Sequence, residues 1–284
     1  MTHMLWALEN PAYGALHARP FMRRRQKYRY TLDYCAYKTL TAEGEWQSYP
    51  YRKPTSVYTN IGFEPRRCTC EGQRHFSSLV GDKARGARGD HGQGAKARLS
   101  VKHTVPTQLL CELLANARRM RPDSKFVLDL FAGTQSVRRA CDELKLKYVS
   151  VDIAPKVRTP EGSYVTMDIV QDLQNASLDD LITRSARLVG EDPKSLLLVW
   201  LSPPCTTYSC ANTLKPPAQR YRDWSHPERP PITEAARRDD ELVEHWINQL
   251  KTRQTRSMPC QRNQPQLSTL CATVAQETFS DIQI

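Results

Sequence analysis

The stretch that decides the fold class is residues 126–136, which read FVLDLFAGTQS. Phe126 to Phe131 form a short apolar run, typical of a strand that is buried on both faces of a parallel sheet. Ala132-Gly133-Thr134 then provides a tight turn, and residues 135–144 are predicted to form a helix. A buried strand, a tight turn and a helix make up the first part of a βαβ unit.

The same alternation continues towards the C-terminus. Two further β-rich stretches end next to acidic residues, Asp152 and Asp168, and a third is almost entirely apolar. The predicted elements are strands at residues 148–153, 163–167 and 195–201 and a helix at residues 178–189. We therefore expect an α/β fold with a doubly wound, mostly parallel sheet.

The two ends of the chain complement each other. Residues 233–251 carry apolar side chains at helical spacing, and such a helix should lead into another strand. Residues 252–284 instead have no sustained periodicity, and we expect them to be a disordered tail. The missing strand is at the other end of the chain, where Met4 to Leu8 form an apolar run. Residues 28–34 and 56–60 are further β-rich pieces.

We divide the chain into four parts. Residues 1–80 hold the N-terminal strands, and residues 81–104 form a flexible linker rich in glycine and charge. Residues 105–251 hold the remaining elements, beginning with a predicted helix at 107–120, and residues 252–284 are the tail. We expect the first and third parts to be halves of one catalytic domain, because a chain of 284 residues can bury one core of ordinary size.

The formal net charge of +11 is concentrated in the N-terminal part of the chain. Residues 1–126 carry 22 Lys and Arg against 10 Asp and Glu, whereas the remaining residues carry 19 against 20. A basic part joined to a neutral part indicates a surface that faces a polyanion. A soluble protein that is merely basic would have the same charge.

The sequence also indicates the cellular environment. No apolar stretch approaches the length that crosses a bilayer, and the N-terminus lacks the pattern of a signal peptide. Nine cysteines are scattered along the chain rather than spaced as a disulfide framework. We therefore expect a soluble intracellular protein with reduced thiols, in cytoplasm or nucleus according to the host, and we expect it to be a monomer.

The turn after the first predicted strand suits a nucleotide-like cofactor, because backbone N–H groups and a helix N-terminus meet there at the carboxyl edge of the sheet. Asp152, 23 residues after Asp129, is predicted to end the second strand, where a carboxylate accepts hydrogen bonds from ribose hydroxyls. NAD and S-adenosylmethionine both fit this geometry. NAD is disfavoured, since Gly133 stands where a dinucleotide fingerprint has three glycines. A structural turn with an incidental acid is the alternative.

Ser202-Pro203-Pro204-Cys205 follows the predicted strand at 195–201. The two prolines restrict the backbone, so that the Cys205 side chain points into a cleft with little freedom to lose. A thiolate is the soft, strong nucleophile that attack on an unsaturated pyrimidine carbon requires. The alternative interpretation is a loop with a buried thiol.

Read together, these groups of residues carry a resemblance to a known family. They are Phe131-Ala132-Gly133-Thr134, Asp152, Asp168, Pro203-Pro204-Cys205, Glu9-Asn10-Pro11, Tyr51-Arg52-Lys53-Pro54-Thr55 with Thr59-Asn60, and Val105-Pro106 with the helix after it. The chain resembles the S-adenosylmethionine-dependent cytosine C5 DNA methyltransferases, in the spelling of their phage-type members, over most of residues 4–250. The resemblance implies a Rossmann-like class I methyltransferase fold acting on double-stranded DNA.

The sequence departs from the family in two ways. In the family the nucleophile loop precedes the Glu-Asn strand, whereas here Glu9 opens the chain and Cys205 comes near its end, which is a circular permutation. The cut would fall at a surface connection, where permutation costs little. The second departure is Gln135, which replaces a glycine of the cofactor loop and should leave less room for the cofactor tail.

The resemblance also implies residue roles. Cys205 would add to C6 of a flipped cytosine, Glu9 would donate a proton to the ring nitrogen, and Arg52 would hold the base carbonyl. Asn10 would orient the turn. The implied cofactor-binding residues are Asp129, Phe131, Ala132, Gly133, Thr134, Gln135, Ser136, Asp152, Ile153, Asp168, Ile169 and Pro203. The candidate DNA-binding residues are Arg23, Arg24, Arg25 and Lys53, although a solvated basic face is an alternative for the arginine run.

Three other hypotheses stay open. A catalytically inactive, permuted or truncated remnant that binds DNA or the cofactor would carry the same motifs. An adenine amino-group methyltransferase is disfavoured, because those enzymes have an aromatic residue where Cys205 stands. Cys35, Cys68, Cys70 and His75 could bind zinc, but a Cys-x-Cys spacing departs from the common two-residue gap, so that we predict no metal.

Overall fold

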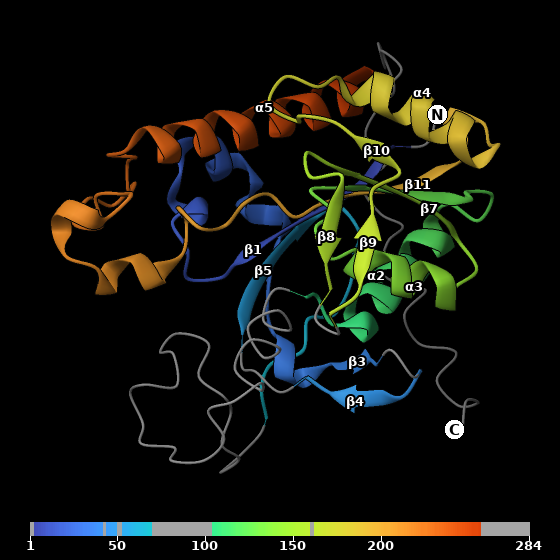
Figure 1. The fold of residues 1–284 in the computed structure, drawn as a ribbon, viewed down its shortest axis with the longest axis horizontal. Helices are drawn as coiled ribbons and strands as arrows, with labels where there is room; N and C mark the ends of the chain where they lie inside the picture. The colour runs from blue at the N-terminus through green and yellow to red at the C-terminus, as the bar shows by residue number, and fades with distance from the viewer. Residues whose placement is uncertain (1–2, 42–43, 50–52, 70–103, 160–161, 257–284) are drawn as a thin grey trace, which may run out of the picture.

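Strands from opposite ends of the chain lie side by side in the centre of one sheet (Figure 1). The computed structural model describes residues 3–41, 44–49, 53–69, 104–159 and 162–256. In spatial order the strands of this sheet are β10 (Ile169–Val170), β7 (Lys147–Asp152), β6 (Phe126–Leu130), β11 (Leu196–Leu201), β1 (Leu5–Pro11), β5 (Pro54–Thr59) and β2 (Arg29–Asp33). The first five run parallel, and β5 is antiparallel to both of its neighbours.

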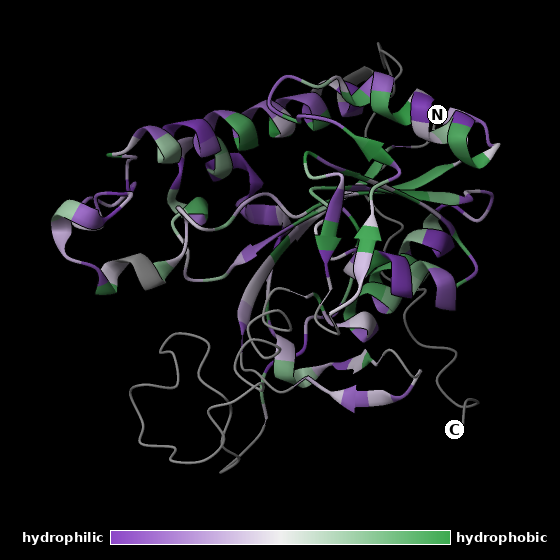
Figure 2. Cartoon of the chain, viewed as in Figure 1, coloured by the Kyte–Doolittle hydropathy of each residue, from purple (hydrophilic) through white to green (hydrophobic). Residues whose placement is uncertain are grey.

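The central strands are buried on both faces, as their apolar runs predict. Every residue of β6 and of β11 is buried. In Figure 2 strands β10 and β11 are mostly green, whereas much of helix α5 is purple. Burial on both faces requires a layer of helices on each side of the sheet.

Two helical layers provide this cover (Figure 1). One face carries α4 (Leu178–Val189) and α5 (Glu234–Arg256), whose apolar side chains share a core cluster with alternate residues of β1 and β6. The other face carries α2 (Thr107–Met120) and α3 (Ser136–Glu143) over a second cluster. The predicted α/β class with a mostly parallel sheet is thus confirmed, and the arrangement is compatible with a Rossmann-like fold.

The segment predicted to be the third strand of the main sheet forms a strand, but it does not join that sheet. Residues Tyr164–Thr166 form β9, but β9 pairs with β8 (Lys156–Arg158) in a separate hairpin. The place beside β7 is taken by β10, whose Ile169 is buried in the core, whereas Tyr164 is 64% exposed. The buried apolar side chain therefore decides which segment joins the sheet.

The other boundaries differ by a few residues. β1 continues through Glu9 and Asn10, and α5 extends past the predicted end at Lys251. The β3 (Lys38–Leu40) and β4 (Trp46–Ser48) hairpin was not predicted. The described 3₁₀ helices are η1 (Leu16–Ala18), η2 (Pro20–Tyr28), η3 (Tyr34–Ala36), η5 (Pro193–Ser195), η6 (Cys210–Leu214) and η7 (Pro217–Gln219).

Most of the predicted linker at 81–104 and of the predicted tail at 252–284 lies outside the described residues. Within the described part of the chain, no helix combines the length and the apolar character that a membrane span needs.

Candidate functional site

The register of β1 and β11 brings the two chain ends to one edge of the sheet. The strands are parallel, with Leu5 opposite Leu198 and Leu8 opposite Leu201. Because parallel strands end on the same side, Glu9 and the loop that carries Cys205 both reach the carboxyl edge. This is the adjacency that the motif order predicts.

Glu9 is buried and held by two neighbours. Its exposed fraction is 7%, and its Oε1 accepts a hydrogen bond of 2.9 Å from the Tyr34 hydroxyl. The Lys53 ammonium lies 3.4 Å from the same oxygen and 4.8 Å from the centre of the Tyr34 ring. The carboxylate therefore has a fixed position and a cation beside it.

The pKa of Cys205 is affected by Glu9 and Lys53 as well. Burial raises the pKa of its thiol, the Lys53 ammonium opposes that rise, and the Glu9 and Asp239 carboxylates add to it. Because charges act on a thiol only at short range, the side chains of Glu9, Lys53 and Cys205 lie near one another at the carboxyl edge. The resting thiol is neutral near pH 7, so that a nucleophilic role requires a partner that stabilises the thiolate.

A buried ion pair holds the segment after Cys205 against α5. The Arg222 side chain has no exposed surface, and its Nη2 donates to Asp240 Oδ1 at 2.7 Å. Its Nε donates to the carbonyl of Thr207 at 3.0 Å, and its guanidinium stacks on the Tyr208 ring at 4.2 Å. Arg19 Nε lies 2.9 Å from Asp240 Oδ2. We name these five residues the Asp240 cluster; it ties the loop after Cys205 to both α5 and the N-terminal segment.

Gly14 allows that N-terminal segment to approach the loop. A Cβ atom at this position would lie 2.9 Å from the Tyr208 carbonyl oxygen, a contact that real side chains do not make. The next residue, Ala15, donates its N–H to the same oxygen at 2.7 Å. The turn after Glu9 therefore rests directly on the loop that carries Cys205.

The loop after β6 has the strained backbone of a close-approach turn. Phe131, Gly133 and Gln135 all have positive φ angles, of 61°, 47° and 56°. The Gly133 N–H donates to Asp152 Oδ2 at 3.0 Å, and the Ala154 N–H donates to Oδ1 at 3.2 Å. Strain at two non-glycine positions is a feature of functional loops. Asp152 thus stands at the end of β7, as predicted, and is hydrogen-bonded to this loop.

A second acid is tied into the same loop. Asp168 Oδ2 accepts from the backbone N–H and the hydroxyl of Ser150, at 2.8 and 2.7 Å. The Gln135 amide donates to the Ser150 hydroxyl at 3.1 Å and to the Thr166 carbonyl at 2.7 Å, and its side chain is buried. The predicted obstruction by Gln135 is therefore reduced, because the side chain is directed towards β7 and β9.

Other predicted cofactor residues differ in their exposure. Ile153 is 65% exposed beside Asp152, which is unusual for an isoleucine and leaves an apolar surface open. Asp129 and Ile169 are buried instead, so that their side chains do not face the edge. The Asp129 carboxyl accepts a hydrogen bond from the Tyr148 hydroxyl at 2.7 Å, and burial raises its pKa to about 8.

The loop is also linked to the elements on both sides of it. The Val105 N–H donates to the Ser136 hydroxyl at 3.2 Å, which places the start of α2 next to the loop. The Thr134 and Ser136 hydroxyls lie 3.4 Å apart. The Ser202 N–H donates to the Leu130 carbonyl at 3.2 Å, so that the loop carrying Cys205, with buried Pro203, begins beside the loop after β6.

The basic run at 23–25 does not form one continuous basic surface. Arg23 and Arg24 are exposed, and Arg23 pairs with Glu228. Arg25 is 8% exposed and lies 5.7 Å from the centre of the Trp6 ring. The reason is the 3₁₀ geometry of η2, in which residues three apart share a face, so that Arg25 follows the buried Met22.

Of the two neighbouring cations Arg52 and Lys53, the structure describes only Lys53. Arg52, predicted to hold the base, lies outside the described residues. Lys53, predicted to contact DNA, forms an ion pair with Glu9. The sequence did not indicate that Lys53 and Tyr34 would lie beside Glu9, or that the Asp240 cluster would form. The pairing of Lys53 with Arg52 in the family-like stretch was the one available signal.

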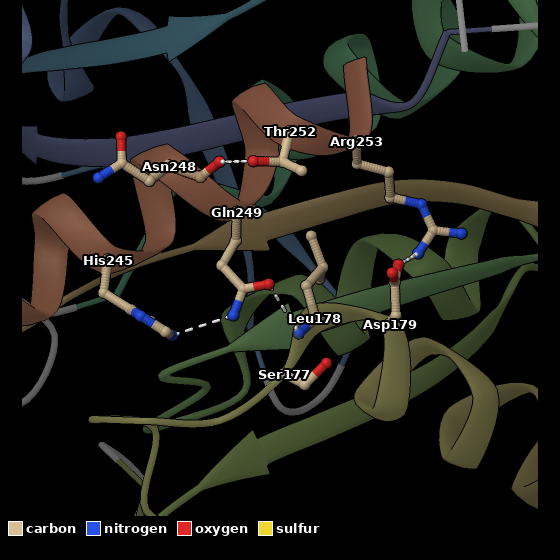
Figure 3. Close-up of a pocket in the computed structure, with 8 residues that line it drawn as sticks. All are labelled: Ser177, Leu178, Asp179, His245, Asn248, Gln249, Thr252 and Arg253. Carbon is tan, nitrogen blue, oxygen red and sulfur yellow. Dashed lines mark hydrogen bonds and ion pairs between the residues drawn. The ribbon is translucent and has the colours of Figure 1, made fainter. Parts of the chain in front are cut away.

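Neither a group of metal ligands nor a pocket coincides with the predicted site among the described residues. Across the described residues, no three His, Cys, Asp or Glu side chains group as metal ligands do; Cys70 and His75 lie outside those residues. A pocket of about 360 Å³ lies between the start of α4 and the end of α5 (Figure 3). It contains none of the predicted site residues, and His245, Gln249 and the Arg253–Asp179 pair that line it are bonded to one another or to the backbone.

Comparison with known proteins returns no relative: no protein-family model matches the chain, and no curated protein matches it at a significant level.

Proposed function

We propose that the chain is an S-adenosylmethionine-dependent methyltransferase that methylates C5 of cytosine in DNA through a covalent adduct of Cys205. The observation that carries this proposal is that β1 and β11 pair in parallel and bring Glu9, its partner Lys53 and the Cys205 loop to one edge of the sheet, where the Cys205 loop begins beside the turn that holds Gly133. A thiol, a carboxylic acid and a cation are the groups that addition to a pyrimidine ring requires.

The residues at the cofactor end fit S-adenosylmethionine. Asp152 keeps acceptor capacity beyond its two backbone donors and suits ribose hydroxyls, and the exposed Ile153 suits the face of an adenine ring. Asp168 is also exposed and suits the adenine amino group. A Cβ at Gly133 would meet no atom closer than 3.9 Å, so that there is room beside the turn. When bound, S-adenosylmethionine supplies the transferable methyl group.

The residues of the nucleophile end perform the remaining steps. The Cys205 thiol gives its proton to the Glu9 carboxylate, and the resulting thiolate attacks C6 of a cytosine that has been flipped out of the duplex. Glu9 donates a proton to the ring nitrogen as negative charge develops there, and Tyr34 keeps its carboxyl in position. Lys53 stabilises the thiolate and the base carbonyl by its charge. Loss of the C5 proton with expulsion of the thiolate ends the reaction.

The strand order supports a circular permutation of the methyltransferase fold. In our proposal β1, β2 and β5 are the last three strands of the family arrangement, and β6, β7, β10 and β11 are the first four. The parallel pairing of β1 with β11 then joins two consecutive strands of the unpermuted order. The antiparallel β5 stands between β1 and β2, which closes that side of the sheet.

The test is trapping on DNA that contains 5-fluorocytosine. With S-adenosylmethionine present, the methyl group and the fluorine block release of the enzyme, so that an active Cys205 forms a complex that survives denaturing electrophoresis. We expect the complex with the wild type and not with Cys205→Ser. Failure of the wild type to form the adduct or to methylate DNA of mixed sequence would favour an inactive remnant.

A further inference from the structure

The turn that follows Glu9 is surrounded by cations. It comprises Ala12, Tyr13 and Gly14, which connect β1 to η1 at the carboxyl edge. Arg29 reaches it from β2, and its Nη2 donates to the Ala12 carbonyl at 2.6 Å. Arg229 reaches it from the segment after Cys205, and its Nη1 donates to the Gly14 carbonyl at 3.0 Å.

Within the described part of the chain, no acidic side chain forms an ion pair with Arg29 or Arg229. The nearest acid in the sequence, Glu228, is directed to Arg23, and Asp240 is shared by Arg19 and Arg222. Two guanidinium groups that converge on one turn repel each other, and each keeps N–H groups beyond those bonded to the turn. An anion at the turn would relieve that repulsion.

The imidazole of His17 is affected by the charges of the same two arginines. It lies on η1, and its pKa is lowered to about 4 by burial and by the charges of Arg29 and Arg229. The imidazole is therefore neutral at pH 7. A hydrogen bond to the backbone of Gly14 opposes this lowering of the pKa but does not cancel it. An anion bound between the three side chains would favour the protonated ring, because it would offset the two positive charges.

Arg229 is also held in a costly conformation. Its φ angle is 48°, in the left-handed region that a branched or long side chain rarely adopts. Its guanidinium stacks over the Trp224 ring at 4.8 Å, and Tyr13 beside it is 55% exposed. The cation is thus fixed in position at a surface that a large ligand can reach.

We propose that Arg29, Arg229 and His17 together bind one phosphate of the DNA strand that carries the target cytosine. This inference rests on the proposed function. A flipped nucleotide remains joined to its backbone, so a base held between Glu9 and Cys205 leaves its phosphates close to both residues. The turn Ala12–Gly14 is close to both, since it follows β1 directly and packs on the loop after Cys205. Arginine pairs bind phosphate oxygens with charge-assisted hydrogen bonds.

The test uses the salt dependence of binding to a fluorescein-labelled DNA duplex. Each phosphate contact contributes about one unit to the slope of log K against log salt. We expect Arg29→Gln and Arg229→Gln each to lower the slope by about 1, and the double variant also by about 1, because the two share one phosphate. Arg184→Gln, which removes a cation that pairs with Asp180 on α4, is the matched control and should leave the slope unchanged.

Other outcomes would overturn the proposal. Unchanged slopes in both single variants would remove the site, and a loss of about 2 in the double variant would assign the two arginines to separate phosphates. Arg229→Lys keeps the charge and should keep the slope; a loss equal to that of Arg229→Gln would mean that Arg229 acts through the turn.

A measurement on the wild type guards against misfolding of the variants. The pKa of His17, followed by NMR of labelled histidine, should rise when DNA is added, and an unchanged value would contradict the proposal. A wild type that methylates DNA but shows unchanged slopes in the variants would sink this inference alone. A wild type that binds no DNA would sink the proposed function with it.

Discussion

The two ends of the carboxyl edge are built in different ways. The cofactor end comes from one continuous stretch, and its acids Asp152 and Asp168 are partly exposed and bound to backbone N–H groups. The nucleophile end comes from three stretches, and its Glu9 is buried with one ammonium group. Chain continuity fixes the first end, whereas the second depends on strand pairing and on the Asp240 cluster. The first should therefore tolerate side-chain changes that the second does not.

The largest expected effect is at the nucleophile. Cys205→Ser should lower methyl transfer by about 10⁴-fold or more, because a serine hydroxyl is a far weaker nucleophile than a thiolate. Cofactor affinity, measured by calorimetry, should stay within about twofold, since the cofactor end is built from other residues. Cys210→Ser is the control and should be nearly neutral. Turnover retained by Cys205→Ser would remove the mechanism.

The comparison also separates what the sequence predicts from what it does not. The Gly133 turn, Asp152 and the strands around them were predicted, because their contacts are local and their apolar runs have one interpretation. The pairing of β1 with β11 was predicted from motif order through the family resemblance. Physical periodicity does not give the partner of a strand at the end of the chain.

Other features were beyond prediction for physical reasons. In the sequence, Arg222 and Asp240 do not differ from other charged residues. An arginine is rarely fully buried unless it is paired, and the sequence does not show that Asp240 is its partner. Arg25 was predicted to be exposed with its neighbours, because the run gives no sign of a 3₁₀ helix. The choice between β9 and β10 depended on which apolar side chain reached the core.

The second-largest effect concerns the device that holds the nucleophile end together. Arg222→Met should lower the free energy of unfolding by about 3 kcal/mol, because it leaves Asp240 with Arg19 alone and removes the donor to the Thr207 carbonyl. Urea denaturation measures this. Arg237→Met, which breaks an exposed pair with Glu234, should leave the free energy of unfolding nearly unchanged, because water screens exposed ion pairs. Equal losses in the two variants would show that the Asp240 cluster has no special importance.

At the cofactor end the expected effect is on affinity rather than stability. Asp152→Asn should raise the Kd for S-adenosylmethionine by about 10- to 100-fold, because hydrogen bonds to a charged acceptor contribute about 1.5–3 kcal/mol. Asp172→Asn, at an exposed position beyond β10, should leave the Kd unchanged. The alkylation rate of Cys205 should be the same in both variants. A change in that rate would show that the two ends of the carboxyl edge are energetically coupled rather than independent.

The smallest expected effect tests whether the single ammonium group at the nucleophile end acts on the thiol. Burial raises the pKa of Cys205, and Lys53 opposes the rise, so that removing Lys53 should raise that pKa further. At a fixed pH below the pKa, each further unit of pKa lowers the thiolate fraction tenfold, and we expect Lys53→Met to slow iodoacetamide alkylation of Cys205 at pH 8 by up to about tenfold. The rate should recover as pH rises, whereas a merely structural disturbance would shift it equally at every pH. Lys53→Arg keeps the charge and should keep the wild-type profile. A Lys53→Met profile that overlays the wild type would mean that Lys53 serves Glu9 alone, and the thiolate would then need another source of stabilisation.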